Sequence, residues 1–194
     1  MKPVAFDAAL RARLATNLAR HAPAPPAPHA LTRAAVCVLV TDGGHGEAAF
    51  LLTRRAERLS THAGQYALPG GRIDGGEAPL EAARREAREE IGLELAPRDF
   101  LGVLDEYPTR SGYLITPLVA WVADGARLAP NPAEVAKIYR VPLADLGRPG
   151  SPQFIAIPES DRPVIRYPVL GTLLHAPTAA VLYQFMEVAV LGRA

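Results

Sequence analysis

Two stretches of the chain repeat apolar residues at the three- and four-residue steps of an amphipathic helix. Near the amino terminus, within residues 6–20, the repeated positions are Phe6, Leu10, Leu14 and Leu18. In the middle of the chain they are Leu80, Ala83, Ala87 and Ile91. Each stripe predicts a helix that packs one face on other elements. A closing helix is predicted over residues 176–191, where Pro177 is tolerated in the first turn.

Short runs of apolar, partly β-branched residues predict strands between these helices. Residues 34–40 and 48–53 flank the turn sequence Thr41-Asp42-Gly43-Gly44, which predicts a hairpin. Further strands are predicted over residues 100–106, 113–122 and 138–141, a turn over residues 142–146, and a hairpin tip at residues 159–162. Strands around one acidic helix are compatible with an α/β fold.

The composition changes at residues 21–29, which read HAPAPPAPH. Proline-rich segments of this kind form semi-rigid, extended connectors. A chain of 194 residues is long enough for one hydrophobic core, and a second full domain is not expected. We therefore expect residues 1–30 to form an N-terminal helix and connector, and residues 31–194 to form one domain.

Charge and cysteine content narrow the classes of partner. The chain has 21 basic and 20 acidic residues, so no overall field recruits nucleic acid or a membrane, and any attraction for phosphate must be local. The single cysteine, Cys37, lies in an apolar run and is interpreted as a core residue of a strand. No stretch approaches the ~20 apolar residues of a membrane span. We expect a cytoplasmic protein, with a homodimer among the oligomeric states left open.

The acidic helix carries the candidate chemistry. At about 100° per residue, Glu86 and Glu90 lie about 40° apart, and Glu89 lies about 60° to the other side of Glu86. Three carboxylates on one face repel one another unless a cation lies among them. Mg²⁺ or Mn²⁺ is the expected cofactor, because both prefer oxygen ligands and leave room for water and substrate phosphate. The three side chains are expected to project together toward solvent.

Polar residues on both sides of this helix are candidates for substrate binding. Arg54 and Arg55 could contact phosphate oxygens, and a solvated basic loop is the alternative. His62, Gly64 and Gln65 fall together ahead of the turn at residues 69–71. The remaining candidates are Arg110 and Tyr113, in and after the loop at residues 107–112, and Glu134, for which helix capping or pairing with Lys137 is the alternative.

The residues around the acidic helix resemble the Nudix box, the motif of hydrolases that cut diphosphates linked to another group. The matching positions are Gly71, Glu77, Arg85, Glu86, Arg88, Glu89, Glu90, Ile91 and Gly92, with Ala87 smaller than the usual residue. The resemblance implies an α/β/α sandwich with a mixed sheet. It also implies Glu86, Glu89, Glu90 and the Gly71 carbonyl as metal ligands. Glu89, Glu90 and Glu134 are the expected catalytic carboxylates, with either Glu89 or Glu134 as the base, and Arg85 is their ion-pairing support.

A second segment is similar to the signature of coenzyme A pyrophosphatases, a Nudix subgroup. The matching positions are Leu51-Leu52-Thr53, Arg55, residues 62–65 and Pro69-Gly70-Gly71. Ala56, Ser60 and Leu68 depart from that signature. The resemblance implies a small nucleotide substrate, coenzyme A or a derivative. ADP-ribose, another nucleoside diphosphate derivative, or nucleotide binding without turnover are the alternatives.

Overall fold

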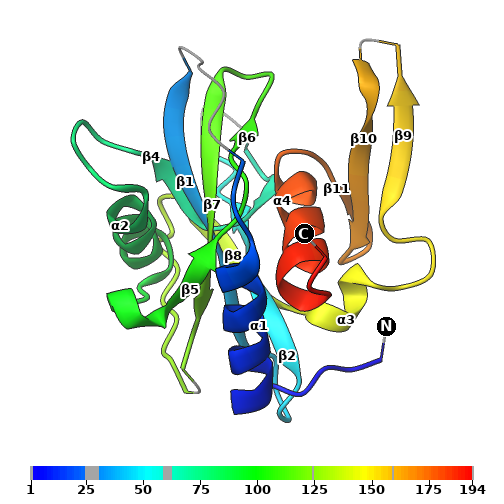
Figure 1. Cartoon of the computed structure of the whole chain (residues 1–194). Coiled ribbons are helices and arrows are strands. Elements are labelled where there is room, and N and C mark those ends of the chain that lie inside the picture. The colour runs from blue at the N-terminus through cyan, green and yellow to red at the C-terminus, as the bar shows by residue number, and fades with distance from the viewer. Residues whose placement is uncertain (1, 25–30, 59–62, 124, 159, 194) are drawn as a thin grey trace.

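A mixed eight-stranded sheet forms the centre of the protein in the computed structural model, which describes residues 2–24, 31–58, 63–123, 125–158 and 160–193 (Figure 1). Its strands are β1 (Thr32–Asp42), β2 (Ala48–Arg55), β3 (Tyr66–Ala67), β4 (Gly70–Arg72), β5 (Phe100–Val103), β6 (Tyr107–Pro108), β7 (Tyr113–Trp121) and β8 (Val135–Pro142). The order is β3-β2-β1-β7-β5, with β4 beside β1, β6 beside β7 and β8 beside β2. Only the β1–β7 pair among these is parallel.

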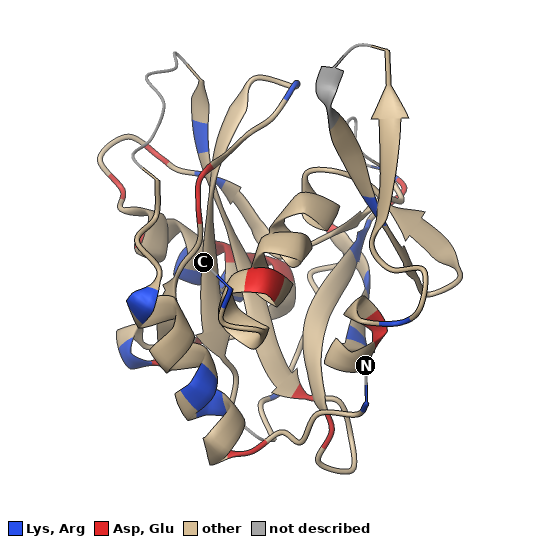
Figure 2. Ribbon diagram, turned by 45° about the vertical axis from the view of Figure 1, so that its right-hand side comes forward, with Lys and Arg blue, Asp and Glu red and all other residues tan. Residues whose placement is uncertain are grey.

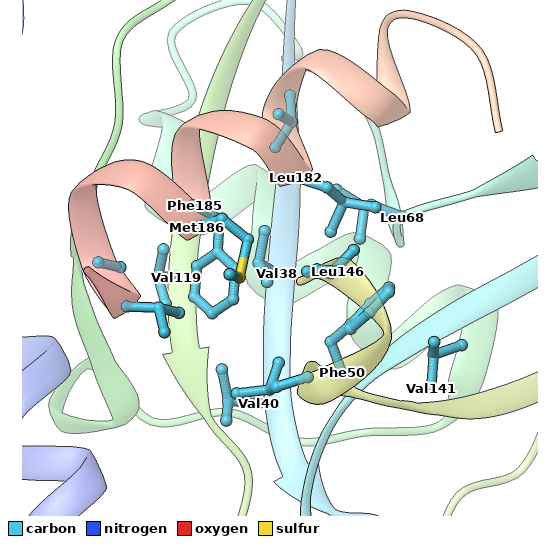
Figure 3. Close-up of a cluster of buried hydrophobic side chains, with 14 of the residues drawn as sticks. Val38, Val40, Phe50, Leu68, Val119, Val141, Leu146, Leu182, Phe185 and Met186 are labelled. Carbon is cyan, nitrogen blue, oxygen red and sulfur yellow. The ribbon is translucent and has the colours of Figure 1, made fainter. Parts of the chain in front are cut away.

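Helices cover both faces of this sheet, because β1 alternates its side chains between two cores. Ala35, Cys37 and Leu39 pack toward α2 (Pro79–Ile91). Val38 and Val40 pack on the opposite side, under α1 (Ala8–Arg20), α4 (Thr178–Gln184) and the π-helical turn η2 (Phe185–Val190). Figure 3 shows the second core, where Phe185 and Met186 lie beside Val38 and Val119. The expected α/β/α sandwich is confirmed.

The amino-terminal helix joins the second core. Asp7 caps α1 by accepting a hydrogen bond from the Leu10 N–H at 2.8 Å, which satisfies one of the free donors of the first turn. Leu10, Leu14 and Leu18, three of the four residues of the predicted stripe, are buried. The described part of residues 1–24 therefore packs on the sheet, and the proposed division of the chain at residue 30 stays a prediction.

A second, smaller sheet follows β8 in the chain. It consists of β9 (Gln153–Ile157), β10 (Ser160–Val169) and β11 (Thr172–Leu174), all antiparallel. The turn expected over residues 142–146 is instead the short helix α3 (Leu143–Leu146), in which two leucines three residues apart are both buried. The 3₁₀ turn η1 (Pro97–Asp99) leads into β5. This strand ends at Val103, so it is shorter than the strand expected over residues 100–106.

The strand β1 changes its neighbour along its length, and this places Gly70 and Gly71 in the sheet. The second half of β1 pairs with β2, at Val40 and Phe50, whereas its first half pairs with β4, at Val36 and Gly70. The Cys37 N–H donates to the Pro69 carbonyl at 2.9 Å and holds the start of β4 in place. Gly70 and Gly71 thus lie in the sheet beneath α2.

The distribution of charged residues and the length of the helices both follow what the composition predicts. Basic and acidic residues are interspersed along the ribbon (Figure 2). Within the described ranges, none of the helices is both long enough and apolar enough to cross a bilayer.

Candidate active site

The acidic helix α2 is held against the sheet by small residues. Ala82, Ala83, Ala87 and Ile91 are buried, and Gly92 ends the helix in the left-handed conformation at φ 67°. Glu90 follows Ala83 by seven positions, which places the two only about 20° apart around the helix. Glu90 therefore lies at the edge of the apolar face, and only 3% of it is exposed. The expectation that it projects toward solvent is wrong.

Glu90 is a buried carboxylate with two polar contacts. Its Oε2 accepts a hydrogen bond from the Gly70 N–H at 3.1 Å, and its Oε1 lies 3.7 Å from Arg55 Nη1. Burial raises the pKa of Glu90 to about 8, and the charges of Glu86 and Glu134 add to this, while the Gly70 N–H and Arg55 oppose it. The site without a cation thus disfavours the carboxylate form of Glu90.

Glu86 lies beside Glu90, over Gly71. A Cβ atom on Gly71 would be 2.2 Å from Glu86 Oε1, so glycine is required for this close approach. Glu86 Oε1 accepts a hydrogen bond from Arg85 Nη1 at 2.7 Å. Burial raises the pKa of Glu86, with Arg85 opposing and Glu89 and Glu134 adding to the rise. Two partly desolvated carboxylates therefore occupy neighbouring positions.

Arg85 organises the acids around it. Its Nε and Nη2 each donate to Glu77 at 3.0 Å, and this bidentate pair lowers the pKa of Glu77. Its Nη2 also donates to the Arg72 carbonyl at 2.9 Å, which ties α2 to β4. Arg85 Nη1 reaches Glu89 Oε2 at 3.2 Å. The expected support of Glu89 by Arg85 is confirmed, and Glu77 braces the loop before the helix.

Glu89 is the most exposed of the three acids, and it shares Arg85 Nη1 with Glu86. Its side chain is 46% exposed and faces Arg85 and, at 4.0 Å, Arg88. Among the residues that the structure describes, no three Asp, Glu, His or Cys side chains lie close enough to hold one ion together. The three carboxylates therefore do not project together toward solvent as predicted, because Glu90 is buried whereas Glu89 is exposed beside Arg85. The roles of these acids as metal ligands and catalysts stay predictions.

Glu86 and Glu90 nevertheless fit a divalent cation. Both offer hard oxygen donors, and each has a pKa raised by burial that a positive ion would reverse. Glu134 acts electrostatically on both, so a third carboxylate lies near the pair, with Asn131 Nδ2 3.5 Å from its Oε1. Mg²⁺ commonly uses one or two carboxylates and completes its shell with water and substrate phosphate.

A cleft of about 580 Å³ begins at the same glycine strand. Its apolar lining comes from Ala34, Val36, Leu68, Gly70, Gly71, Ile115, Pro177 and Val181. Its polar lining, called the rim below, comes from Arg55, Gln65, Tyr66, Arg72, Thr109, Ser111, Tyr113 and Thr178. The lining thus combines residues of β1, β2, β3, β4 and β7 with the start of α4, which lies on the face opposite α2 (Figure 1).

Several residues predicted to bind substrate lie elsewhere or only near this cleft. Arg54 pairs with Glu57 and donates to the Gly64 carbonyl at 3.4 Å. Gln65 lines the cleft, as does Arg55. Arg110 is exposed in the loop between β6 and β7, next to two lining residues. His62 lies outside the described residues.

Sequence reasoning missed most of the rim. Arg72 follows the glycine pair, and its Nη2 donates to the Tyr113 hydroxyl at 2.8 Å. Its position directly after Gly71 was a usable signal. Thr178 lies more than a hundred residues from Gly71 in the sequence and reaches the cleft only through the packing of α4. No local pattern marks such a residue.

The fold and this site define a class: an α/β/α sandwich in which a glycine strand lies against an acidic helix. The NUDIX domain matches residues 31–166, and the chain belongs to this family. It is 46% identical over 96 residues to the Uncharacterized Nudix hydrolase NudL of Photorhabdus laumondii, covering 49% of this chain and 51% of that protein. It is 35% identical over 126 residues to NudL of Klebsiella pneumoniae strain 342, covering 64% and 66%.

The matched part of the chain therefore spans about half the length of the first of these relatives and 66% of the length of the second. Among solved structures, a Nudix hydrolase from M. smegmatis, RenU, is 27% identical with a TM-score of 0.55, covering 82% of this chain and 86% of that one. A MutT/nudix family protein from Enterococcus faecalis has a TM-score of 0.58 at 18% identity, covering 85% and 64%. The second likeness concerns the fold alone.

Proposed function

We propose that this chain hydrolyses a diphosphate linkage in a nucleotide derivative, with Mg²⁺ or Mn²⁺ as cofactor. The observation that carries the proposal is the pair Glu86 and Glu90, two partly desolvated carboxylates set against Gly71 and Gly70, which themselves line the cleft. Glu86, Glu90 and the Gly71 carbonyl would hold the ion. When bound, it neutralises phosphate oxygens and lowers the pKa of a water molecule.

The protein's own groups would orient the substrate. Arg55 and Arg72 line the cleft beside the glycine strand, where their guanidinium groups can donate to the oxygens of the diphosphate. Arg85 keeps Glu86 in place through the 2.7 Å hydrogen bond. Water oxygen attacks one phosphorus, the bridging P–O bond breaks, and the proton of the water passes to a carboxylate. Glu89 and Glu134 are the two candidates for this base.

Coenzyme A or one of its derivatives is the substrate that we propose, with 3′,5′-ADP and 4′-phosphopantetheine, or its acyl form, as products. The signature before the acidic helix supports this choice, and four of its members, Arg55, Gln65, Gly70 and Gly71, line the cleft. The volume of about 580 Å³ is in the range of small-molecule sites. The first alternative is ADP-ribose or another nucleoside diphosphate derivative.

A substrate panel tests both proposals. The purified chain is incubated with coenzyme A, ADP-ribose and a dinucleoside polyphosphate, each with Mg²⁺, Mn²⁺ or EDTA, and products are identified by mass. We expect 3′,5′-ADP from coenzyme A only with a divalent ion. Glu90→Gln serves as the inactive variant, and Glu94→Gln, an exposed acid beyond the end of α2, as its matched control. Cleavage of ADP-ribose alone would overturn the choice of substrate.

The second alternative is nucleotide binding without turnover. Calorimetry with coenzyme A, run beside the hydrolysis assay, separates it from catalysis. Binding with no metal-dependent product from any member of the panel would overturn the proposed hydrolase. The presence of Glu86, Glu89 and Glu90 together favours turnover, because a purely binding site gains nothing from three acids near a phosphate.

A further inference from the structure

Two tyrosines and two cations gather where β2, β3 and β8 meet. Arg54 in β2 is the register partner of both Tyr66 in β3 and Lys137 in β8, so the three side chains share one face of the sheet. The hydroxyls of Tyr66 and Tyr139 are hydrogen-bonded, and their ring centroids lie 5.5 Å apart. Lys137 Nζ lies 4.9 Å from the centroid of the Tyr139 ring. These four residues are called the Tyr66 cluster below.

The positive charge of the Tyr66 cluster is only partly neutralised. Arg54 is paired with Glu57, and both side chains remain partly exposed. In the part of the chain that the structure describes, no carboxylate lies within ion-pair distance of Lys137, so the predicted alternative of pairing with Glu134 is not formed. The Tyr139 hydrogen bond raises the pKa of Tyr66, and the charges of Arg54 and Lys137 oppose that rise.

The Tyr66 cluster adjoins the cleft through Tyr66 itself. Tyr66 belongs to the rim, between Gln65 and the glycine strand. Arg54 and Arg55 are consecutive residues of β2, so their side chains point to opposite faces of the sheet. Arg55 accordingly reaches Glu90, whereas Arg54 belongs to the cluster. Arg55 and Tyr66 nevertheless line the same cleft, so a ligand with its diphosphate at Arg55 can extend over Tyr66 toward Lys137.

Resting on the proposed hydrolase function, we propose that the Tyr66 cluster binds a phosphate monoester that the substrate carries apart from its scissile diphosphate. In coenzyme A this group is the 3′-phosphate. Lys137 supplies a positive charge, and the tyrosine hydroxyl that does not donate to its neighbour supplies a donor, which together can recognise a phosphate dianion. The cluster thus selects nucleoside diphosphate derivatives that bear an additional phosphate over those, such as ADP-ribose, that lack one.

Hydrolysis of a matched substrate pair tests this selection. We expect kcat/KM for coenzyme A to exceed that for dephospho-coenzyme A by at least roughly tenfold, which corresponds to the lower end of the range for one charged hydrogen bond. Lys137→Gln should bring the ratio close to one. Arg140→Gln is the control, because Arg140 is also an exposed residue of β8. Its register partner is Leu51, which places it on the α2 face of the sheet, away from the Tyr66 cluster. A ratio near one in the wild-type chain, or a ratio unchanged by Lys137→Gln, would overturn the inference.

A binding measurement separates this inference from the proposed function. Calorimetry without metal compares 3′,5′-ADP with 5′-ADP, which has the same number of phosphates in a different arrangement. We expect 3′,5′-ADP to bind the wild-type chain roughly tenfold more tightly, and Tyr66→Phe and Lys137→Gln each to reduce that preference. If neither coenzyme A nor dephospho-coenzyme A is hydrolysed, the proposed function is contradicted but the phosphate subsite is not. Equal binding of the two nucleotides would defeat the phosphate subsite, whatever the activity.

Discussion

Replacing Gly71 with alanine should lower activity by at least about 100-fold while leaving the protein folded. An added Cβ would lie 2.2 Å from Glu86 Oε1, 2.5 Å from its Cδ and 2.8 Å from its Oε2, so the carboxylate must move by roughly an ångström to reach ordinary contact. A displacement of this size at a reacting centre costs on the order of 100-fold in rate. We expect kcat/KM to fall at least that far, together with the affinity for Mn²⁺ measured by calorimetry.

The cost in stability should be small, because the obstructing atoms are the end of a flexible side chain. Alanine also reduces the freedom of the unfolded chain, worth about 0.4–1 kcal/mol in favour of folding. The melting temperature should therefore change by no more than roughly 2–4 °C. Gly70→Ala provides the contrast, since its Cβ would lie 2.2 Å from the Ala35 carbonyl and 2.6 Å from Val36 Cα, both backbone atoms, at φ 152°.

Gly75→Ala is the neutral control, because a Cβ there meets no atom within 4 Å in the described chain. We expect Gly70→Ala to melt well below the wild-type protein, and Gly75→Ala to retain both stability and activity. If Gly71→Ala keeps near-normal hydrolysis, then the position of the Glu86 carboxylate does not matter for the reaction. If it unfolds as readily as Gly70→Ala, the contact with Glu86 is structural.

Three further substitutions test other parts of the structure. In EDTA, the free energy of unfolding measured by urea denaturation should fall as the pH rises from about 4.5 to about 8, because folded Glu90 holds its proton more tightly than unfolded Glu90. Glu90→Gln should remove this dependence on pH. Glu77→Gln should cost about 1–2 kcal/mol at pH 7, and less as the pH falls through the lowered pKa of Glu77, since it loses the bidentate bond to Arg85. Leu14→Ala should lower the free energy of unfolding by about 2–5 kcal/mol, because Leu14 is buried in the core. The control Arg13→Ala, at an exposed position, should lower it by less than about 0.5 kcal/mol. Equal melting temperatures of the two variants would show that α1 does not contribute to the core.

Local patterns in the sequence were sufficient for the elements that depend on near neighbours. The hairpin of β1 and β2 follows from two apolar runs around a glycine turn, and the pairing of Val40 with Phe50 confirms it. The stop of α2 at Gly92 follows from the freedom of glycine to adopt positive φ. The contact of Arg85 with Glu89 follows from their four-residue spacing.

The tertiary structure decided which of the acids share an environment. Helical spacing places Glu86, Glu89 and Glu90 on neighbouring angles but leaves the rotation of α2 over the sheet undefined. Packing of Ala83 and Ala87 on β1 sets that rotation, and it buries Glu90 while Glu89 stays exposed.

The cleft and the Tyr66 cluster depend on pairing between distant segments. Tyr66 and Lys137 are brought together because each pairs with Arg54, and Thr178 completes the cleft because α4 packs on the second core. Sequence periodicity reports which face of an element is apolar, since that property is local. Which elements become neighbours depends on the burial of whole faces against one another, and no single segment contains that information.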